Sequence, residues 1–370
     1  MLIRITHSGA RAKDYFSRSL ALWVPAKSAN PRVTKVHEGK IEPPRDPPKC
    51  CTNGIDCYTN SGQALLHRPA NCSLGIQSLL SHSHSSASYI KPRTLDEAIA
   101  FLAAGESRIL SGGTDFYPAL GDHVVRDAVV DVSGLQELRG ISAGRDGDRD
   151  TNRFRIGGLT TWTDIVRTSL PRCFDGLKAA AREVGSIQIQ NRGTIAGNLC
   201  NASPAADGVP PLLALDAEIE LTSQAGVRLM PLADFIVGNR KTLRKADEIL
   251  TAVYIPGAIE DAASTFVKLG SRRYLVISIS MVAAIIHVKD GRVAEARVAV
   301  GSCSAVARRL PALESELAGA DVDDDLGALV KPEHLASLSP IDDIRATAAY
   351  RLDASFRLVQ RALNLCREKG

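Results

Sequence analysis

The sequence predicts a fold that mixes helices and strands, of the α+β or α/β class, and three observations support this. Strand-like and helix-like segments alternate between residues 89 and 185. Two β-rich runs at 278–288 and 293–300 are joined by Asp290-Gly291, which is typical of a β-hairpin. Apolar residues then recur every three or four positions over 341–363, which indicates a long amphipathic helix at the end of the chain.

Helix signals recur in the first half of the chain. Thr94 and Glu97 have the spacing of a capping box, and apolar residues follow at helical intervals, which predicts a helix from residue 95. Thr161 and Asp164 repeat the signal and predict a second helix. The alanine-rich segment 177–184 predicts a third.

Short runs rich in β-branched and other apolar residues lie between and after these helices and predict strands. They occupy residues 108–110, 128–132, 154–156, 217–221 and 249–255. We expect a short apolar helix just before residue 217. Pro256 ends the last of these strands, because proline cannot donate to a strand ladder.

By composition the chain divides into three parts. Residues 1–88 contain a proline-rich stretch and the polar tract 81–88, which predicts a disordered extension; a linker, a wrongly assigned start codon or an organelle transit peptide are the alternatives. Past Pro256 the sequence changes to the two β-rich runs and the amphipathic terminal helix described above. We therefore expect a first folded domain at 89–260 and a second at 261–370.

A metal or iron–sulfur site is an alternative function for the extension. The residues that could build it are Cys50, Cys51, Cys57, Cys72, His82 and His84. A plant-type iron–sulfur run needs C-x4-C-x2-C, whereas the spacing here is CC-x5-C-x14-C. We reject the cluster on this spacing and expect no metal site in the chain.

The overall composition is that of a globular protein and argues against two classes of partner. The net charge is +4, and it arises in residues 1–88, which hold 11 Lys and Arg against 5 Asp and Glu; the remainder is slightly acidic, so we expect no nucleic-acid partner. No apolar run reaches the roughly 20 residues of a membrane span. The cysteines at 173, 200, 303 and 366 are far apart, which indicates free thiols and a cytoplasmic location.

One segment suits the binding of an anion. The strand at 108–110 runs into Ser111-Gly112-Gly113-Thr114-Asp115, where glycine permits a positive φ and successive N–H groups can surround a phosphate. Thr114 adds a hydroxyl donor. The segment has neither the P-loop pattern nor G-x-G-x-x-G, so by itself it is also compatible with a plain turn.

A second glycine-bearing segment strengthens the case for a ligand. Residues 192–198 (RGTIAGN) are followed by 201–207 (NASPAAD), which places many small and hydrogen-bonding groups beside a predicted apolar helix. Such a stretch packs poorly as a core and suits the wall of a site for a large polar ligand, although a long turn-rich loop is the alternative. Two separate glycine loops fit a ligand with two phosphates and two flat rings.

These two segments, in this order and about 80 residues apart, resemble those of the flavin-binding subunit of the molybdenum hydroxylases, the family of xanthine dehydrogenase and aerobic carbon monoxide dehydrogenase. The runs 238–250, 271–273 and 343–351 add to the resemblance, which covers about residues 89–366. It implies an α+β fold. A two-part FAD-binding domain of the vanillyl-alcohol-oxidase type would be followed by a smaller α/β domain with an antiparallel sheet.

The resemblance also implies which residues contact FAD. Those of the first loop would hold the diphosphate, with Gly112, Gly113 and Thr114 at its centre. Further contacts fall in the second loop and on two later positions, Leu250 and Lys268. The complete set is Arg108, Ile109, Leu110, Ser111, Gly112, Gly113, Thr114, Asp115, Phe116, Thr194, Gly197, Asn198, Ser203, Asp207, Leu250 and Lys268.

The implied activity is that of an oxidoreductase subunit. Electrons would leave a molybdopterin-binding large subunit, cross iron–sulfur clusters on another subunit, and reach FAD on this chain, which would pass them to NAD+ or another acceptor. The loop after Lys268 carries no acidic residue, so the acceptor stays open. Two alternatives remain: a self-sufficient FAD-dependent oxidase, for which we find no catalytic base, and a non-catalytic scaffold that has lost flavin.

Overall fold

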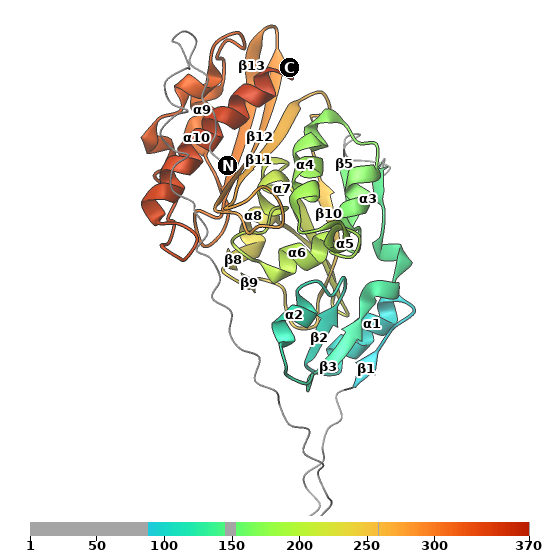
Figure 1. Cartoon of the computed structure of the whole chain (residues 1–370). Coiled ribbons are helices and arrows are strands. Elements are labelled where there is room, and N and C mark those ends of the chain that lie inside the picture. The colour runs from blue at the N-terminus through green and yellow to red at the C-terminus, as the bar shows by residue number, and fades with distance from the viewer. Residues whose placement is uncertain (1–87, 145–152, 258, 370) are drawn as a thin grey trace, which may run out of the picture. The chain divides into compact units, whose positions relative to one another are not determined.

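The computed structural model describes residues 88–144, 153–257 and 259–369. The cysteines and histidines considered above for a metal site lie outside these residues. Four β-sheets organise the described part of the chain, and helices cover them (Figure 1). The fold is α+β: apart from one small parallel sheet, the strands pair antiparallel.

The small parallel sheet begins the folded part and carries the first glycine loop. Its strand order is β1-β3-β2, with β1 at Tyr89–Ile90, β2 at Ser107–Leu110 and β3 at Ala128–Asp131. Helix α1 (Leu95–Ala103) packs on it, and Thr94 caps that helix by accepting from the amide of Glu97. The Glu97 carboxylate accepts from the Arg93 amide at 2.7 Å instead of closing the predicted capping box.

A five-stranded antiparallel sheet forms the middle of the described region. Its order is β4-β5-β10-β6-β7. The strands are β4 (Ile141–Gly144), β5 (Arg153–Gly157), β6 (Glu218–Ser223), β7 (Gly226–Pro231) and β10 (Ile249–Ile255). The predicted strands at 154–156, 217–221 and 249–255 therefore become neighbours, because β10 pairs with both β5 and β6.

Helices connect the strands of these sheets. In the chain, α2 (Phe116–Leu120) lies between β2 and β3 of the parallel sheet, and α8 (Leu232–Phe235) follows β7. Between β5 and β6 lie α3 (Trp162–Arg167), α4 (Asp175–Glu183), α5 (Ile187–Gln190), α6 (Ile195–Asn201) and α7 (Val209–Ala214). The capping box of α3 is complete, with Thr161 and Asp164 each accepting from the other's amide. A two-stranded hairpin, β8 (Ile236–Gly238) with β9 (Lys241–Thr242), follows α8.

The last sheet is antiparallel with the order β11-β12-β13-β14. Its strands are β11 (Ala263–Leu269), β12 (Ser280–Lys289), β13 (Arg292–Gly301) and β14 (Arg308–Arg309). Strand β12 is apolar on both faces because it lies between two cores: Met281, Ala283 and Ile285 face the core with α4 and α7, whereas Val282 and Ala284 face helices α9 (Pro311–Leu317) and α10 (Ala348–Arg367).

The terminal helix is shorter than predicted. The apolar spacing predicts a helix from Ile341, but α10 begins at Ala348, with Thr347 as its N-cap, and both Ile341 and Ile344 are exposed. The reason is a local ion-pair network: Arg351 on the first turn of α10 donates to Asp343 at 2.8 Å and holds the preceding segment in a turn. The apolar spacing of 341–347 is therefore coincidental.

Short 3-10 turns complete the described elements, at Val132–Gly134, Gln136–Leu138, Arg172–Phe174, Leu326–Leu329 and Pro332–Leu335. Among the described helices, none is both long and apolar enough to cross a membrane.

Candidate functional site

The first glycine loop leaves the end of β2 and enters α2. Gly113 has φ +75°, in the left-handed region that favours glycine, and a Cβ there would stand 2.8 Å from the Tyr117 ring. Within the described ranges, the backbone N–H groups of Gly112, Gly113 and Thr114 donate to no protein acceptor. These amides are available to an anion, as expected for a turn of this kind.

The second loop begins helix α6. Thr194 is the N-cap of that helix and accepts from the amide of Gly197 at 3.1 Å. The amides of Ile195 and Ala196 donate to the carbonyls of Thr160 and Gly158 at 3.0 Å, which fixes the start of α6 against the segment after β5. The loop is thus rigidly attached to the five-stranded sheet.

The two loops, 83 residues apart in the sequence, are in direct contact. The hydroxyls of Ser111 and Thr194 are 3.2 Å apart. Gly112 lies so close to the second loop that a Cβ would stand 2.1 Å from the carbonyl oxygen of Arg192. Close packing of two backbones is possible here because glycine carries no side chain.

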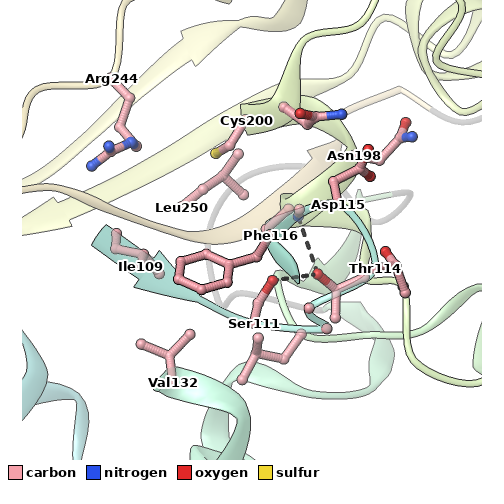
Figure 2. Close-up of a pocket in the computed structure, with 18 of the residues that line it drawn as sticks. Ile109, Ser111, Thr114, Asp115, Phe116, Val132, Asn198, Cys200, Arg244 and Leu250 are labelled. Carbon is pink, nitrogen blue, oxygen red and sulfur yellow. Dashed lines mark hydrogen bonds between the residues drawn. The ribbon is translucent and has the colours of Figure 1, made fainter. Parts of the chain in front are cut away.

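A pocket of about 990 Å³ lies where the loops meet. This volume is at the upper end of the range that binds cofactors and other small molecules. Figure 2 shows Ile109, Phe116 and Val132 on one wall and Cys200, Arg244 and Leu250 on another. The predicted site residues in its lining are Arg108, Ile109, Ser111, Gly112, Gly113, Thr114, Asp115, Phe116, Thr194, Gly197, Asn198 and Leu250.

The other four predicted residues do not line this pocket. Leu110 is buried at the end of β2, and the Ser203 hydroxyl accepts from the Ala205 amide at 3.3 Å. Asp207 and Lys268 form an ion pair of 2.6 Å, with side chains that are 8% and 7% exposed. Asp207 also accepts from the Ser278 hydroxyl at 2.6 Å. Burial raises the pKa of Asp207 from its ordinary value, although the ammonium of Lys268 opposes that shift.

Several lining residues are absent from the prediction. They come from three places: the apolar floor, helix α6 and the β8–β9 hairpin with the basic segment after it. The main examples are Trp162, Val184, Ile189, Cys200, Asn201, Arg240, Lys241, Thr242 and Arg244. The run 238–250 holds four cations and a glycine-asparagine turn signal, and these are the sequence features that indicate a phosphate-facing surface here.

The basic segment after the hairpin is held by a nearly buried carboxylate. Glu248 accepts from the guanidinium of Arg228 at 2.6 and 2.9 Å and from the Lys245 amide at 2.7 Å. Burial alone would raise the pKa of Glu248, but the hydrogen bonds from Arg228 and Lys245 outweigh it, so the pKa lies below its ordinary value. The Arg244 guanidinium donates to the Glu248 carbonyl at 2.8 Å.

The pocket also contains an unsatisfied polar atom. The amide oxygen of Asn198 is buried and has no hydrogen-bond partner in the described part of the protein. Buried polar atoms are nearly always paired, so one that lines a pocket indicates a donor supplied by a ligand. Nearby, burial raises the pKa of the Cys200 thiol to about 11.

Comparison with known proteins identifies the family. A family model described as "FAD binding domain in molybdopterin dehydrogenase" matches residues 83–258, and one described as "CO dehydrogenase flavoprotein C-terminal domain" matches 265–365. The xanthine dehydrogenase FAD-binding subunit of Escherichia coli O157:H7 is 33% identical over 270 residues, which is 72% of this chain and 91% of that protein. The chain belongs to the FAD-binding (medium) subunits of the molybdenum hydroxylase family.

Two further comparisons agree. The FAD subunit of nicotinate dehydrogenase from Eubacterium barkeri is 38% identical over 199 residues, or 52% of this FAD-binding subunit and 65% of that one. A carbon monoxide dehydrogenase chain from Hydrogenophaga pseudoflava superposes with a TM-score of 0.68 at 25% identity, covering 76% of this subunit and 96% of that chain. The relatives are dehydrogenase subunits, so this subunit is part of an oxidoreductase with FAD as its cofactor.

The pocket of this FAD-binding subunit has features that suit FAD. The amides of the first loop can donate to phosphate oxygens, and the Asn198 oxygen can accept from a ligand N–H or hydroxyl. A Cβ at Gly197 would stand 2.9 Å from the Thr194 hydroxyl and 3.1 Å from that of Ser111, so only glycine leaves this cradle open. Among the residues described, no group of three or more His, Cys, Asp or Glu side chains could hold a metal ion.

Proposed function

We propose that this subunit relays electrons within a larger enzyme. It would receive them from an iron–sulfur subunit, which in turn serves a molybdopterin-binding large subunit, and would deliver them to NAD+ or another acceptor. The names of the relatives support this, because they are subunits or medium chains of dehydrogenases, and this chain spans 91% of the E. coli relative. When bound, FAD supplies the exchange between two-electron and one-electron carriers.

We further propose that the residues predicted from the sequence hold FAD. The first loop would donate backbone N–H groups to the diphosphate, with Arg108 and Phe116 beside it; the guanidinium of Arg108 lies 4.6 Å from the centre of the Phe116 ring. Thr194, Gly197 and Asn198 would form the facing wall. The other four predicted residues would support this wall indirectly, by fixing the loops and the adjoining sheet; they are Leu110, Ser203, Asp207 and Lys268.

One observation carries the proposal: two glycine loops from distant parts of the chain touch each other and border the same pocket. In a turn that only connects a strand to a helix, nothing requires the backbone to pack against another loop while its own amides stay unbonded. Joint binding of one extended anionic ligand accounts for both features. We also propose that residues 89–260 form the FAD-binding domain, that residues 261–370 form the second domain and that residues 1–88 are an extension. The enzyme would be cytoplasmic.

A separate point of the proposed function is the electron acceptor. The loop from Gly270 to Ser278 follows Lys268, and its Tyr274 is 63% exposed, with Leu275 also exposed. An exposed tyrosine offers a flat apolar surface to a nicotinamide or another aromatic acceptor.

The experiment is to purify the full chain alone and with its genomic neighbours. We expect the lone chain to bind FAD and to turn over no small substrate, and we expect an iron–sulfur subunit and a large molybdopterin subunit to co-purify with it. Anaerobic NADH should bleach the flavin absorbance of the complex if NAD+ is the acceptor. Turnover by the lone chain would instead indicate an oxidase, and a colourless chain that takes up no FAD would indicate a scaffold.

A further inference from the structure

The turn between β8 and β9 has an arginine at a position that favours glycine. Gly238 and Lys241 pair across this hairpin, with Asn239 and Arg240 as its two central residues. Arg240 has φ +54°, in the left-handed region, where turns of this geometry usually place glycine or asparagine. Six non-glycine residues in the described part of the chain have a positive φ, so the assignment of a function to Arg240 depends on the contacts of its side chain and on its place at the pocket.

The surrounding contacts orient this arginine toward the pocket. Its amide donates to the carbonyl of Ala202 at 2.9 Å, and its guanidinium donates to the side-chain oxygen of Asn201. Both partners lie at the end of α6, the helix that begins at Thr194 in the second glycine loop. Arg240, Asn201 and Thr194 all line the pocket, so the hairpin is attached to the same helix that carries the loop.

The hairpin places positive charge at the pocket without neutralising it. Within the described residues, no carboxylate lies within 4.0 Å of the Arg240 or Lys241 side chain, whereas Arg228 close by is paired with Glu248. The segment that follows the hairpin in the chain is held in place by the Arg228–Glu248 pair and by Arg244, whose guanidinium donates to backbone carbonyls. Cations without a carboxylate partner that line the same pocket as free backbone amides are complementary to phosphate groups.

We propose that Arg240 is a further binding residue for the diphosphate of FAD, acting together with the first glycine loop that lines the same pocket. The inference rests on the proposed assignment of this pocket to FAD. It explains why an arginine occupies a turn position that glycine would occupy with less strain.

The test uses the full chain stripped of flavin and titrated with FAD at about 20 mM and about 500 mM salt. Arg240→Gly should weaken FAD binding about 5- to 10-fold at low salt and about twofold or less at high salt, because salt screens a partly exposed charge. The same variant should raise the Tm of the flavin-free chain by about 1–2 °C, because it relieves the left-handed strain. Arg240→Lys should retain most of the affinity.

Two variants serve as matched controls. Asp290→Gly removes a left-handed side chain, with φ +53°, from the β12–β13 turn, and should leave FAD affinity unchanged. Lys289→Gln removes one exposed positive charge from the same distant hairpin and should also leave the affinity unchanged at both salt concentrations.

Three results would overturn the inference: wild-type FAD affinity in Arg240→Gly, a loss of affinity that does not depend on salt, or an equal loss in Lys289→Gln. A wild-type chain that binds no FAD at all would be a different failure, because it would remove the assignment of the pocket itself.

Discussion

Gly112 and the carbonyl of Arg192 are in such close contact that a Cβ on Gly112 would stand 2.1 Å from the carbonyl oxygen. This contact joins the two glycine loops and so sets the width of the pocket between them. A backbone carbonyl cannot move aside as the end of a flexible side chain can. The relationship therefore makes a direct prediction about flavin binding.

Gly112→Ala should push the loops apart, destabilise the fold by about 1–3 kcal/mol and lower FAD affinity at least about tenfold. Urea unfolding and FAD titration measure the two effects. Gly105→Ala is the matched control, because a Cβ at Gly105 would meet nothing within 4 Å. Unchanged flavin affinity in Gly112→Ala would show that the loops do not bind FAD jointly.

The buried pair of Asp207 and Lys268 should be important to stability. Lys268→Met leaves a buried carboxylate without its cation, which typically costs about 3–5 kcal/mol. Asp207→Asn together with Lys268→Met removes both charges and should be less destabilising than Lys268→Met alone. Equilibrium urea unfolding of the two single variants and the double variant checks this, and purely additive effects would contradict a coupled pair.

The pair of Glu248 and Arg228 predicts a pH dependence. Because the folded-state pKa of Glu248 is lowered from 4.5, its ionised form adds stability that is fully present above about pH 4.5 and is lost as the pH falls through the folded-state pKa. Glu248→Gln should be less stable than wild type at pH 6, by about 1–3 kcal/mol. The difference in Tm between the two proteins should shrink steadily as the pH is lowered to 3; a constant difference would exclude this role for the carboxylate.

Cys200 should be chemically inert although it lines the pocket. With a pKa of about 11, its thiolate fraction at pH 8 is smaller than that of an ordinary cysteine by about two orders of magnitude. Iodoacetamide labelling followed by peptide mapping should therefore modify Cys200 at least about 100-fold more slowly in the native chain than in urea. Rapid native labelling would mean that a nearby group stabilises the thiolate.

Local signals in the sequence were sufficient for most individual elements. The capping residues Thr161 and Thr94 start α3 and α1 as predicted, and Asp290-Gly291 turns β12 into β13. The prediction of a longer terminal helix was wrong because apolar periodicity carries no information about ion pairs between charged side chains. Arg351 and Asp343 hold residues 341–347 in a turn that the apolar spacing of this segment does not reveal.

The sequence by itself determined the family, the α+β class and the two glycine loops, because these depend on residue types at fixed local spacing. Only the tertiary structure decided that Ser111 touches Thr194, that Asp207 pairs with Lys268, and that Arg240 borders the same pocket. Such contacts depend on how strands 80 or more residues apart pair within sheets, and on which side chains become neighbours once water is excluded. A short stretch of sequence specifies neither the pairing of distant strands nor the neighbours of a side chain.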